Sequence, residues 1–291
     1  MTLFHKRIFL ARPASIYAVL LVNVAFAASV HAADYVKSFS ISNRAKVHVD
    51  TNDGNVQIVT GDTKEVEFRV EYTGLAIDKT LHIDSRQQGD DVEITARVVG
   101  RTPFSVRALA KLRVVVRMPK DGDLRAESGD GSITVDGLSG AVDLRSGDGK
   151  LSVKSLTGEV RLHSGDGSID GIDLDGKCDV VSGDGHIRVT GRFDVLRARS
   201  GDGRIDVAAL HGSKLESNWD IGSGDGRIDL ALPTELAAFI DANSRDGQIS
   251  TSIPLAVQGI IGKSQLRGNM NGGGKTMSIH SGDGAIRLKQ V

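Results

Sequence analysis

The tetrapeptide Ser-Gly-Asp-Gly recurs at a constant spacing along the second half of the chain. Its first five copies start at Ser128, Ser146, Ser164, Ser182 and Ser200, and so keep one strict period. Two later copies start at Ser223 and Ser281, and a variant, Ser244-Arg245-Asp246-Gly247, lies between them. A repeat of constant length indicates one structural unit stacked on itself. Because such a stack offers many equivalent positions instead of one special site, it argues against an enzyme.

Each unit alternates between apolar and polar residues. Counted from the serine, positions 6, 8, 15 and 17 are mostly apolar, and positions 7 and 16 are polar. In the unit of Ser146 the apolar positions are Leu151, Val153, Val160 and Leu162. A period of 2 is typical of half-buried strands, and the many glycines disfavour helices. We therefore expect two short strands and two turns in each unit.

Glycine and aspartate mark both turns of the unit. One turn is the tetrapeptide, where we expect glycine to supply positive φ and aspartate to bond its own backbone. The other lies at residues 136–140 and at equivalent places such as Leu156-Thr157-Gly158. The predicted structural turn aspartates are Asp130, Asp148, Asp166, Asp184, Asp202, Asp225, Asp246 and Asp283.

A strand, turn, strand, turn unit of fixed length is typical of one rung of a β-solenoid, with rungs about 4.8 Å apart. A meander of antiparallel hairpins has no reason to keep its inward positions at so strict a period. We expect an all-β fold in which residues 121–291 form a single-chain parallel β-solenoid (β-helix) of roughly 18-residue rungs. Later units carry insertions after Gly212 and Ile253.

Residues 33–120 lack the tetrapeptide but show similar alternation, for example at 45–49, 66–70 and 112–118. Asn52-Asp53-Gly54-Asn55 resembles a degenerate copy of the turn. We expect an irregular, β-rich N-terminal region that caps the solenoid; a separate small β-domain is the alternative.

The beginning of the chain, at positions 1–32, has the pattern of an export signal. Lys6, Arg7 and Arg12 precede a mostly apolar run at 16–28, and small residues follow it. About 13 apolar residues are too few for a spanning helix, which needs about 20. We expect a signal peptide at 1–32, export to the periplasm or the cell surface, and a mature chain that is not an integral membrane protein.

Charge and cysteine content narrow the classes of partner. The chain has 36 basic and 37 acidic side chains, so it has no overall attraction to nucleic acid. Cys178 is the one cysteine, so no intramolecular disulfide can form. It holds an inward position, and we expect a buried packing thiol there.

Taken together, the export signal, the β-rich first half and the tandem Ser-Gly-Asp-Gly-x-Ile-x-Val units resemble a bacterial family of putative adhesins, β-strand-repeat domains of unknown function. The resemblance runs from about Tyr35 to Val291, and Met118-Pro119-Lys120 is similar to the family's V-P-x junction. It implies an exported β-solenoid without catalytic residues, and it implies no ligand.

Basic residues gather in one part of the repeats and form the predicted ligand-binding set. Guanidinium groups bind carboxylate or phosphate in a bidentate manner, which suits an anionic polysaccharide or a lipid headgroup. Interleaved aspartates such as Asp194 and Asp206 favour a self-paired, solvated surface as the alternative. The set consists of Arg188, Arg192, Arg197, Arg199 and Arg204.

Two other functions compete with simple binding. The acidic turns resemble calcium-binding nonapeptide repeats, but here the aspartate lies between the glycines, so we expect no metal. A cluster of aspartates could serve a polysaccharide lyase or hydrolase, although acid/base work requires carboxylates in unlike environments. This cluster is Asp170, Asp173, Asp175 and Asp179.

The histidines lack metal-ligand spacing, and no Gly-x-Ser-x-Gly elbow occurs. We therefore predict a non-catalytic exported β-solenoid without cofactor or metal, which acts as an adhesin or an envelope scaffold. Its partner would be an envelope protein or polysaccharide and not nucleic acid. A carbohydrate-active β-helix on acidic polysaccharide and a calcium-binding repeat protein are the alternatives.

Overall fold

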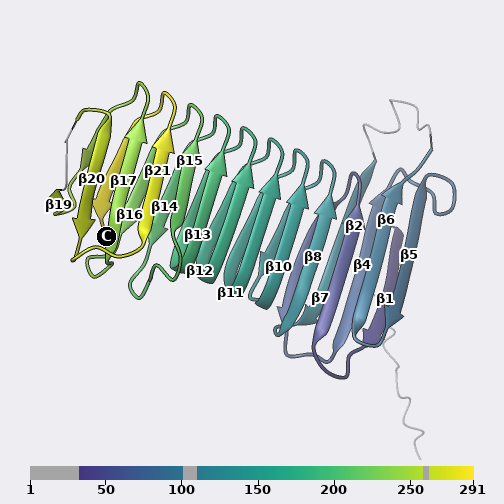
Figure 1. Ribbon diagram of the computed structural model, residues 1–291. Coiled ribbons are helices and arrows are strands. Elements are labelled where there is room, and N and C mark those ends of the chain that lie inside the picture. Colours follow the sequence, from purple (N-terminus) through teal and green to yellow (C-terminus); the bar gives the residue numbers. More distant parts are fainter. Residues whose placement is uncertain (1–32, 101–109, 258–261) are drawn as a thin grey trace, which may run out of the picture. The chain divides into compact units, whose positions relative to one another are not determined.

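A computed structural model of the chain describes residues 33–100, 110–257 and 262–291 (Figure 1). The predicted signal peptide lies outside this part. Every regular element of the described residues is a strand and none is a helix, so the all-β prediction is confirmed. Residues Ala32–Val291 form one compact unit, and the domain boundary expected at residue 120 stays a prediction.

The strands form two stacks of neighbours. In spatial order, the first stack contains β5 (Leu81–Gln88), β6 (Asp91–Val98), β2 (Ala45–Thr51), β8 (Gly122–Ser128), β10 (Ser139–Ser146), the C-terminal halves of β11 (Leu151–Ser164), β12 (Ile169–Ser182) and β13 (Ile187–Ser200), then β15 (Trp219–Ser223), β21 (Thr276–Ser281), β17 (Ala238–Ser244), β20 (Gln265–Met270) and β19 (Ala256–Val257). Figure 1 shows most of this order directly.

The second stack contains β1 (Ala33–Ser40), β4 (Glu65–Thr73), β7 (Lys111–Pro119), β3 (Asn55–Gly61), β9 (Ile133–Asp136), the N-terminal halves of β11, β12 and β13, then β14 (Ile205–Ala209), β16 (Ile228–Leu232), β22 (Ile286–Gln290) and β18 (Ile249–Thr251). The inward side chains of both stacks belong to one hydrophobic core.

Neighbouring repeats pair in parallel, and residues of a regular unit lie beside their equivalents in the next unit, except at the bend between β12 and β13, where the register shifts by one residue. Val142 is paired with Val160, and Leu151 with Ile169. The predicted inward positions are confirmed, because the apolar residues at positions 6, 8, 15 and 17 of the five regular units are buried. Cys178 is among them, and burial raises the pKa of its thiol to about 12. This thiol is therefore uncharged at neutral pH and packs as an apolar group.

In three of the units the second predicted turn is a bend inside a continuous strand. β11, β12 and β13 each run through it, and pairs such as Thr157 with Asp175 continue the ladder around the corner. Left-handed backbone makes the bend: φ is 52° at Ser155 and 123° at Gly158. In these units the expected interruption was wrong, because the hydrogen bonds run between rungs and survive a change of direction within a rung. At residues 136–140 it is confirmed, since β9 ends as this turn begins and β10 begins within it.

The tetrapeptide turn is closed by its serine. The buried Ser146 Oγ accepts a hydrogen bond from the Gly149 N–H at 3.0 Å and donates to the carbonyl of Gly131 in the preceding unit, also at 3.0 Å. Ser182, Ser200 and Ser223 repeat both contacts. One hydroxyl thus holds its own turn and ties it to the turn below.

The glycines of the tetrapeptide serve close approach and not positive φ. None of them falls in the left-handed range, contrary to our expectation. A methyl group on Gly149 would lie 2.1 Å from the Gly131 carbonyl oxygen, and one on Gly147 would lie 2.6 Å from that of Gly129. Stacked backbones therefore leave no room for a side chain at either position.

The eight predicted turn aspartates are exposed at the tips of the turns. The hydrogen bonds that close the turns come from the serines, so the proposed Asx bond is not what shapes them. The degenerate copy in the first half is shifted by one residue from our alignment. Thr51 pairs with Ser128, and its Oγ1 accepts from the Gly54 N–H at 3.2 Å.

The two ends of the repeat array are not the two ends of the chain. β21 and β22, which hold the last repeat, lie between the rung of Ser223 and that of Ser244. In Figure 1 the yellow β21 lies between β15 and β17. β2 and β3 are likewise inserted between β6/β7 and β8/β9. The order in space therefore departs from the order in sequence at both ends.

Antiparallel strands cover the outermost rungs. β5 covers β6, and β4 with β1 covers β7; β20 covers β17 at the other end. The aromatic ring of Phe39 stacks on that of the buried Phe68, with ring centres 6.2 Å apart. Exposed strand edges promote aggregation, and reversed strands that do not match the repeat end the array.

We expect Ser182→Ala to lower the free energy of unfolding by about 1–3 kcal/mol, because a buried N–H and a carbonyl lose their common partner. Asp184→Asn is the matched control on the same turn, and a change within about 0.5 kcal/mol is expected for this exposed side chain. Denaturant unfolding measures both. If Asp184→Asn lowered the free energy of unfolding more than Ser182→Ala does, the aspartate and not the serine would be the residue that stabilises the turn.

We also expect the backbone amides of β21 to exchange hydrogen as slowly as those of β12, although β21 lies near the chain terminus. Both strands have a parallel neighbour on each side. β1, which pairs with β4 alone among the described strands, should exchange faster. Hydrogen exchange with mass spectrometry measures this, and rapid exchange in β21 would contradict the inserted position.

Candidate functional site

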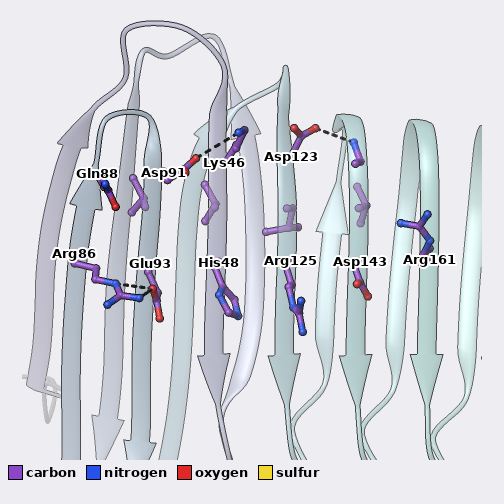
Figure 2. Close-up of a pocket in the computed structure, with 15 residues that line it drawn as sticks. Lys46, His48, Arg86, Gln88, Asp91, Glu93, Asp123, Arg125, Asp143 and Arg161 are labelled. Atoms are coloured by element: carbon purple, nitrogen blue, oxygen red, sulfur yellow. Dashed lines mark hydrogen bonds and ion pairs between the residues drawn. The ribbon is translucent and has the colours of Figure 1, made fainter.

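The outer face of the first stack is hollowed over its first six strands, from β5 to β11. The hollow has a volume of about 630 Å³ and is open to solvent (Figure 2). Its polar side chains come from β5, β6, β2, β8, β10 and β11: Arg86, Gln88, Asp91, Glu93, Lys46, His48, Asp123, Arg125, Asp143 and Arg161.

A second hollow of about 290 Å³ adjoins the first. The two share Asp143 and Arg161, and the second extends to Asp179 on β12 and Arg197 on β13. Both hollows therefore follow one direction, across the strands. We call the two together the groove.

Strand register places one row of polar residues, most of them charged, across the first stack, and its part from Arg86 to Arg197 lies along the groove. Each member is the direct cross-strand partner of the next, and basic and acidic residues mostly alternate. In spatial order this charge row is Arg86, Glu93, His48, Arg125, Asp143, Arg161, Asp179, Arg197, Asp220, Ser278, Asp241 and Arg267. Alternation follows from stacking, since like charges about 4.8 Å apart repel and opposite charges attract.

The charges of the groove pair with neighbours that are themselves exposed. Arg86 bonds Glu93 at 2.7 Å, and Lys46 lies 3.9 Å from Asp91. Arg44 donates to Asp123 at 3.0 Å, and this bond holds the pKa of that carboxyl below its usual range. Exposed pairs of this kind contribute little stability. A ligand can therefore replace them at small cost.

Two polar atoms of the charge row are buried without a hydrogen-bond partner among the described residues. They are Nε2 of His48, in the first hollow, and Oδ1 of Asp179, in the second. Such atoms cost free energy and are uncommon in folded proteins. A ligand hydroxyl that met either group after a side-chain rotation would satisfy it.

The five predicted ligand-binding arginines do not form one surface. Arg197 and Arg199 lie on the first stack and pair with Asp179 and Asp220. Arg192 is at the bend, with bonds to Asp175 at 2.6 Å and Asp194 at 2.5 Å. Arg188 and Arg204 belong to the second stack. Only Arg197 borders the groove.

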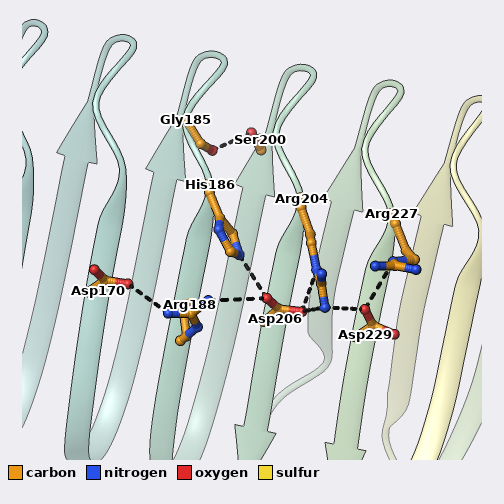
Figure 3. A network of polar contacts seen from close by, with 9 residues as sticks. All are labelled: Asp170, Gly185, His186, Arg188, Ser200, Arg204, Asp206, Arg227 and Asp229. Carbon is orange, nitrogen blue, oxygen red and sulfur yellow. Dashed lines mark hydrogen bonds and ion pairs between the residues drawn. The ribbon is translucent and has the colours of Figure 1, made fainter.

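On the second stack the charges form a closed network (Figure 3). Asp206 bonds His186 at 2.8 Å and Arg204 at 2.7 Å. Asp229, whose side chain is only 12% exposed, meets Arg204 at 2.7 Å, Arg227 at 3.2 Å and Arg287 at 3.8 Å. The self-paired alternative therefore describes this face.

The aspartate cluster suggested for an enzyme is dispersed. Asp170 lies on the second stack beside Lys150 and Arg188, and Asp179 lies on the first. Asp173, at the bend, accepts a bond from Ser155 Oγ at 2.9 Å. In the part of the chain that the structure describes, no group of three or more His, Cys, Asp or Glu side chains could hold a metal ion. The same residues include no helix of the length and apolarity that a membrane span requires.

The insertion after Gly212 builds a third hollow, of about 350 Å³, with residues 235–237. There the Gly212 N–H donates to Glu235 Oε1 at 3.1 Å, and His211 lies 2.9 Å from the same carboxyl. The insertion after Ile253 includes residues 258–261, which lie outside the described residues.

Sequence reasoning missed the groove, because its residues come from distant parts of the chain. β2, β5 and β6 contain no tetrapeptide, and their order in the stack is not their order in sequence. The one available signal was the alternation of charge at position 16, as in Asp143, Arg161, Asp179 and Arg197.

Comparison with known proteins identifies a family. A family model described as Toastrack DUF4097 matches residues 40–289. The expected resemblance to a β-strand-repeat family of unknown function is confirmed at this level. Whether Ser-Gly-Asp-Gly is typical of the whole family stays a prediction. No curated protein matches the chain.

Several solved structures are similar in part. A protein of Parabacteroides distasonis described as a putative lipid binding protein has a TM-score of 0.48 at 13% identity, covering 88% of this chain and 96% of its own. A putative adhesin of Bacteroides fragilis gives 0.41 at 10%, covering 89% and 97%. One of Parabacteroides merdae gives 0.40 at 12%, covering 88% and 95%. Similarities this low say nothing about what the present chain binds.

We predict an acid-dependent loss of stability at the third hollow. Hydrogen bonds from the N–H groups of Glu235 itself and of Gly212, together with His211, lower the pKa of the Glu235 carboxyl from 4.5 to about 2. A depressed carboxyl pKa stabilises the fold above the unfolded value, and this contribution disappears as pH falls through the folded value. The melting temperature of the wild type should exceed that of Glu235→Gln above pH 5, and the gap should close between about pH 4.5 and 2. A gap that widens toward acid would refute this.

Proposed function

The chain belongs to the Toastrack DUF4097 family, and we propose that it is a non-catalytic, exported β-solenoid that binds a polymer of the cell envelope through the groove. Adhesion to a surface and scaffolding within the envelope both use such a binding face. The export rests on the pattern of residues 1–32.

We also infer that the fold is a parallel β-solenoid whose rungs are the repeat units, with reversed strands at both ends. In-register parallel pairing from β8 to β16 supports it. Such a stack is rigid and presents the same outward position again at every strand, which suits a repetitive partner.

The observation that carries the binding function is the groove itself. Two adjoining hollows lie on one row of charged side chains, and that row contains two buried polar atoms without partners among the described residues. Arginines of both stacks pair with neighbouring carboxylates, as Arg204 does with Asp229 on the second stack and Arg125 with Glu127 on the first. Arg125, Arg161 and Arg197 line the two hollows, so a ligand there can replace their exposed partners.

A non-catalytic role is supported by the distribution of carboxylates. Acid/base chemistry on a glycosidic bond uses two carboxyl groups on opposite sides of that bond, within about 10 Å of each other and held in different environments. Asp143 and Asp179 in the groove instead alternate with Arg125, Arg161 and Arg197 along one row on one face of the sheet.

We expect the purified protein to bind polysaccharide from the envelope of the cells that produce it, as measured by biolayer interferometry. Arg125→Gln combined with Arg161→Gln should weaken binding roughly tenfold, since each exposed charge contact is worth up to about 1 kcal/mol. Arg188→Gln combined with Arg204→Gln, on the second stack, is the matched control and should bind like the wild type.

A loss of binding in the control pair alone would move the site to the second stack. If the protein binds no envelope fraction, the proposal fails. Shortening of the polysaccharide during incubation would show that the protein is an enzyme. In cell fractionation the protein should be found outside the cytoplasm with Ala33 as its first residue.

A further inference from the structure

We propose that the ligand of the groove is a linear anionic glycan that lies across the strands, with its acid groups in register with Arg125, Arg161 and Arg197. This inference rests on the proposed binding function and adds the chemical class of the ligand and its orientation.

The two hollows indicate the direction in which the glycan lies on the sheet. The first extends from β5 to β11 and the second from β10 to β13, and they share Asp143 and Arg161. A small ligand would fill one hollow, whereas a groove that crosses this many parallel strands suits an extended chain. The described strands from β6 to β13 are paired on both sides, and a peptide strand added at the edge of β5 would run along the strands and not across them.

The alternation of the charge row determines the spacing expected between the acid groups of the glycan. Arg125, Arg161 and Arg197 lie on every second strand, with Asp143 and Asp179 between them. Strands in a sheet are about 4.8 Å apart, so successive guanidinium groups recur at about 9.6 Å. An extended β-linked disaccharide has a similar length. A glycan with one carboxylate in each disaccharide would therefore place one acid group at each arginine.

The aspartates between the arginines select a glycan over other polyanions. Carboxylates accept hydrogen bonds from sugar hydroxyls, and Oδ1 of Asp179 is a buried acceptor without a partner among the described residues. A nucleic acid, with a charge on every nucleotide and a net negative protein opposite it, would be repelled at those positions. Guanidinium groups bind the glycan carboxylates in a bidentate manner.

The test uses hyaluronan oligosaccharides, which carry one carboxylate in each disaccharide, in calorimetric titrations at low ionic strength. We expect affinity to rise from the tetrasaccharide to the hexasaccharide, as the third arginine is reached, and to fall with added salt. Arg197→Gln should weaken hexasaccharide binding roughly threefold to tenfold and leave tetrasaccharide binding unchanged. Arg199→Gln, on the same strand but off the charge row, is the matched control.

Any one of four results would overturn the inference. They are absence of hyaluronan binding, equal affinity for neutral cello-oligosaccharides, equal affinity for oligogalacturonate, which carries an acid on every sugar, and an effect of Arg197→Gln that does not depend on length. If the pair Arg125→Gln and Arg161→Gln still abolished binding of another envelope fraction, the proposed function would stand while the ligand class would be wrong.

Discussion

The contact between one tetrapeptide turn and the next is the interaction on which the whole structure depends. A single buried hydroxyl, such as that of Ser146, accepts from its own turn and donates to the turn below. The flanking glycines allow the backbones to approach closely enough for this bond, and any Cβ there would collide with a carbonyl oxygen. Because the contact repeats at each rung, it also fixes the register of both stacks, and register determines which side chains face inward and which lie in one outward row.

The inserted terminal rungs follow from the same need for paired neighbours. A rung at the end of a parallel stack has a free edge, and a chain terminus placed there would fray. Here the last repeat, β21 with β22, has a parallel neighbour on either side. Antiparallel pairing covers the rungs at three of the four stack ends, and β18 ends the second stack as a parallel strand. The loop before β21 permits this return, because Asn271 and the next three glycines all have positive φ.

Much of the fold could be predicted from the sequence, because alternation with period 2 and a constant repeat report directly on which side chains are buried. The inward residues of the regular units were identified in this way, and the structure confirms them. Two features of the fold could not be predicted from the sequence: the order of the strands at the ends and the role of the serine. Strand order at the ends depends on which distant segments fit best, as for β2 between β6 and β8. The role of serine was hidden, since a composition of glycine and aspartate suggests ordinary turn chemistry, whereas the decisive bond runs to the preceding unit.

The residues of the charge row can contribute both to the stability of the stack and to the binding of a ligand. In-register parallel stacking would place like charges about 4.8 Å apart, so alternation of sign is required for stability alone and is no evidence of a ligand. On the second stack two like charges, Asp206 and Asp229, are direct cross-strand partners, and the arginines around them offset their repulsion. What distinguishes the first stack is that its surface is hollowed along the row. The row of charges that stabilises the stack can bind a partner only where the surface beside it is hollowed. In this chain the hollows lie where the inserted N-terminal strands meet the regular repeats.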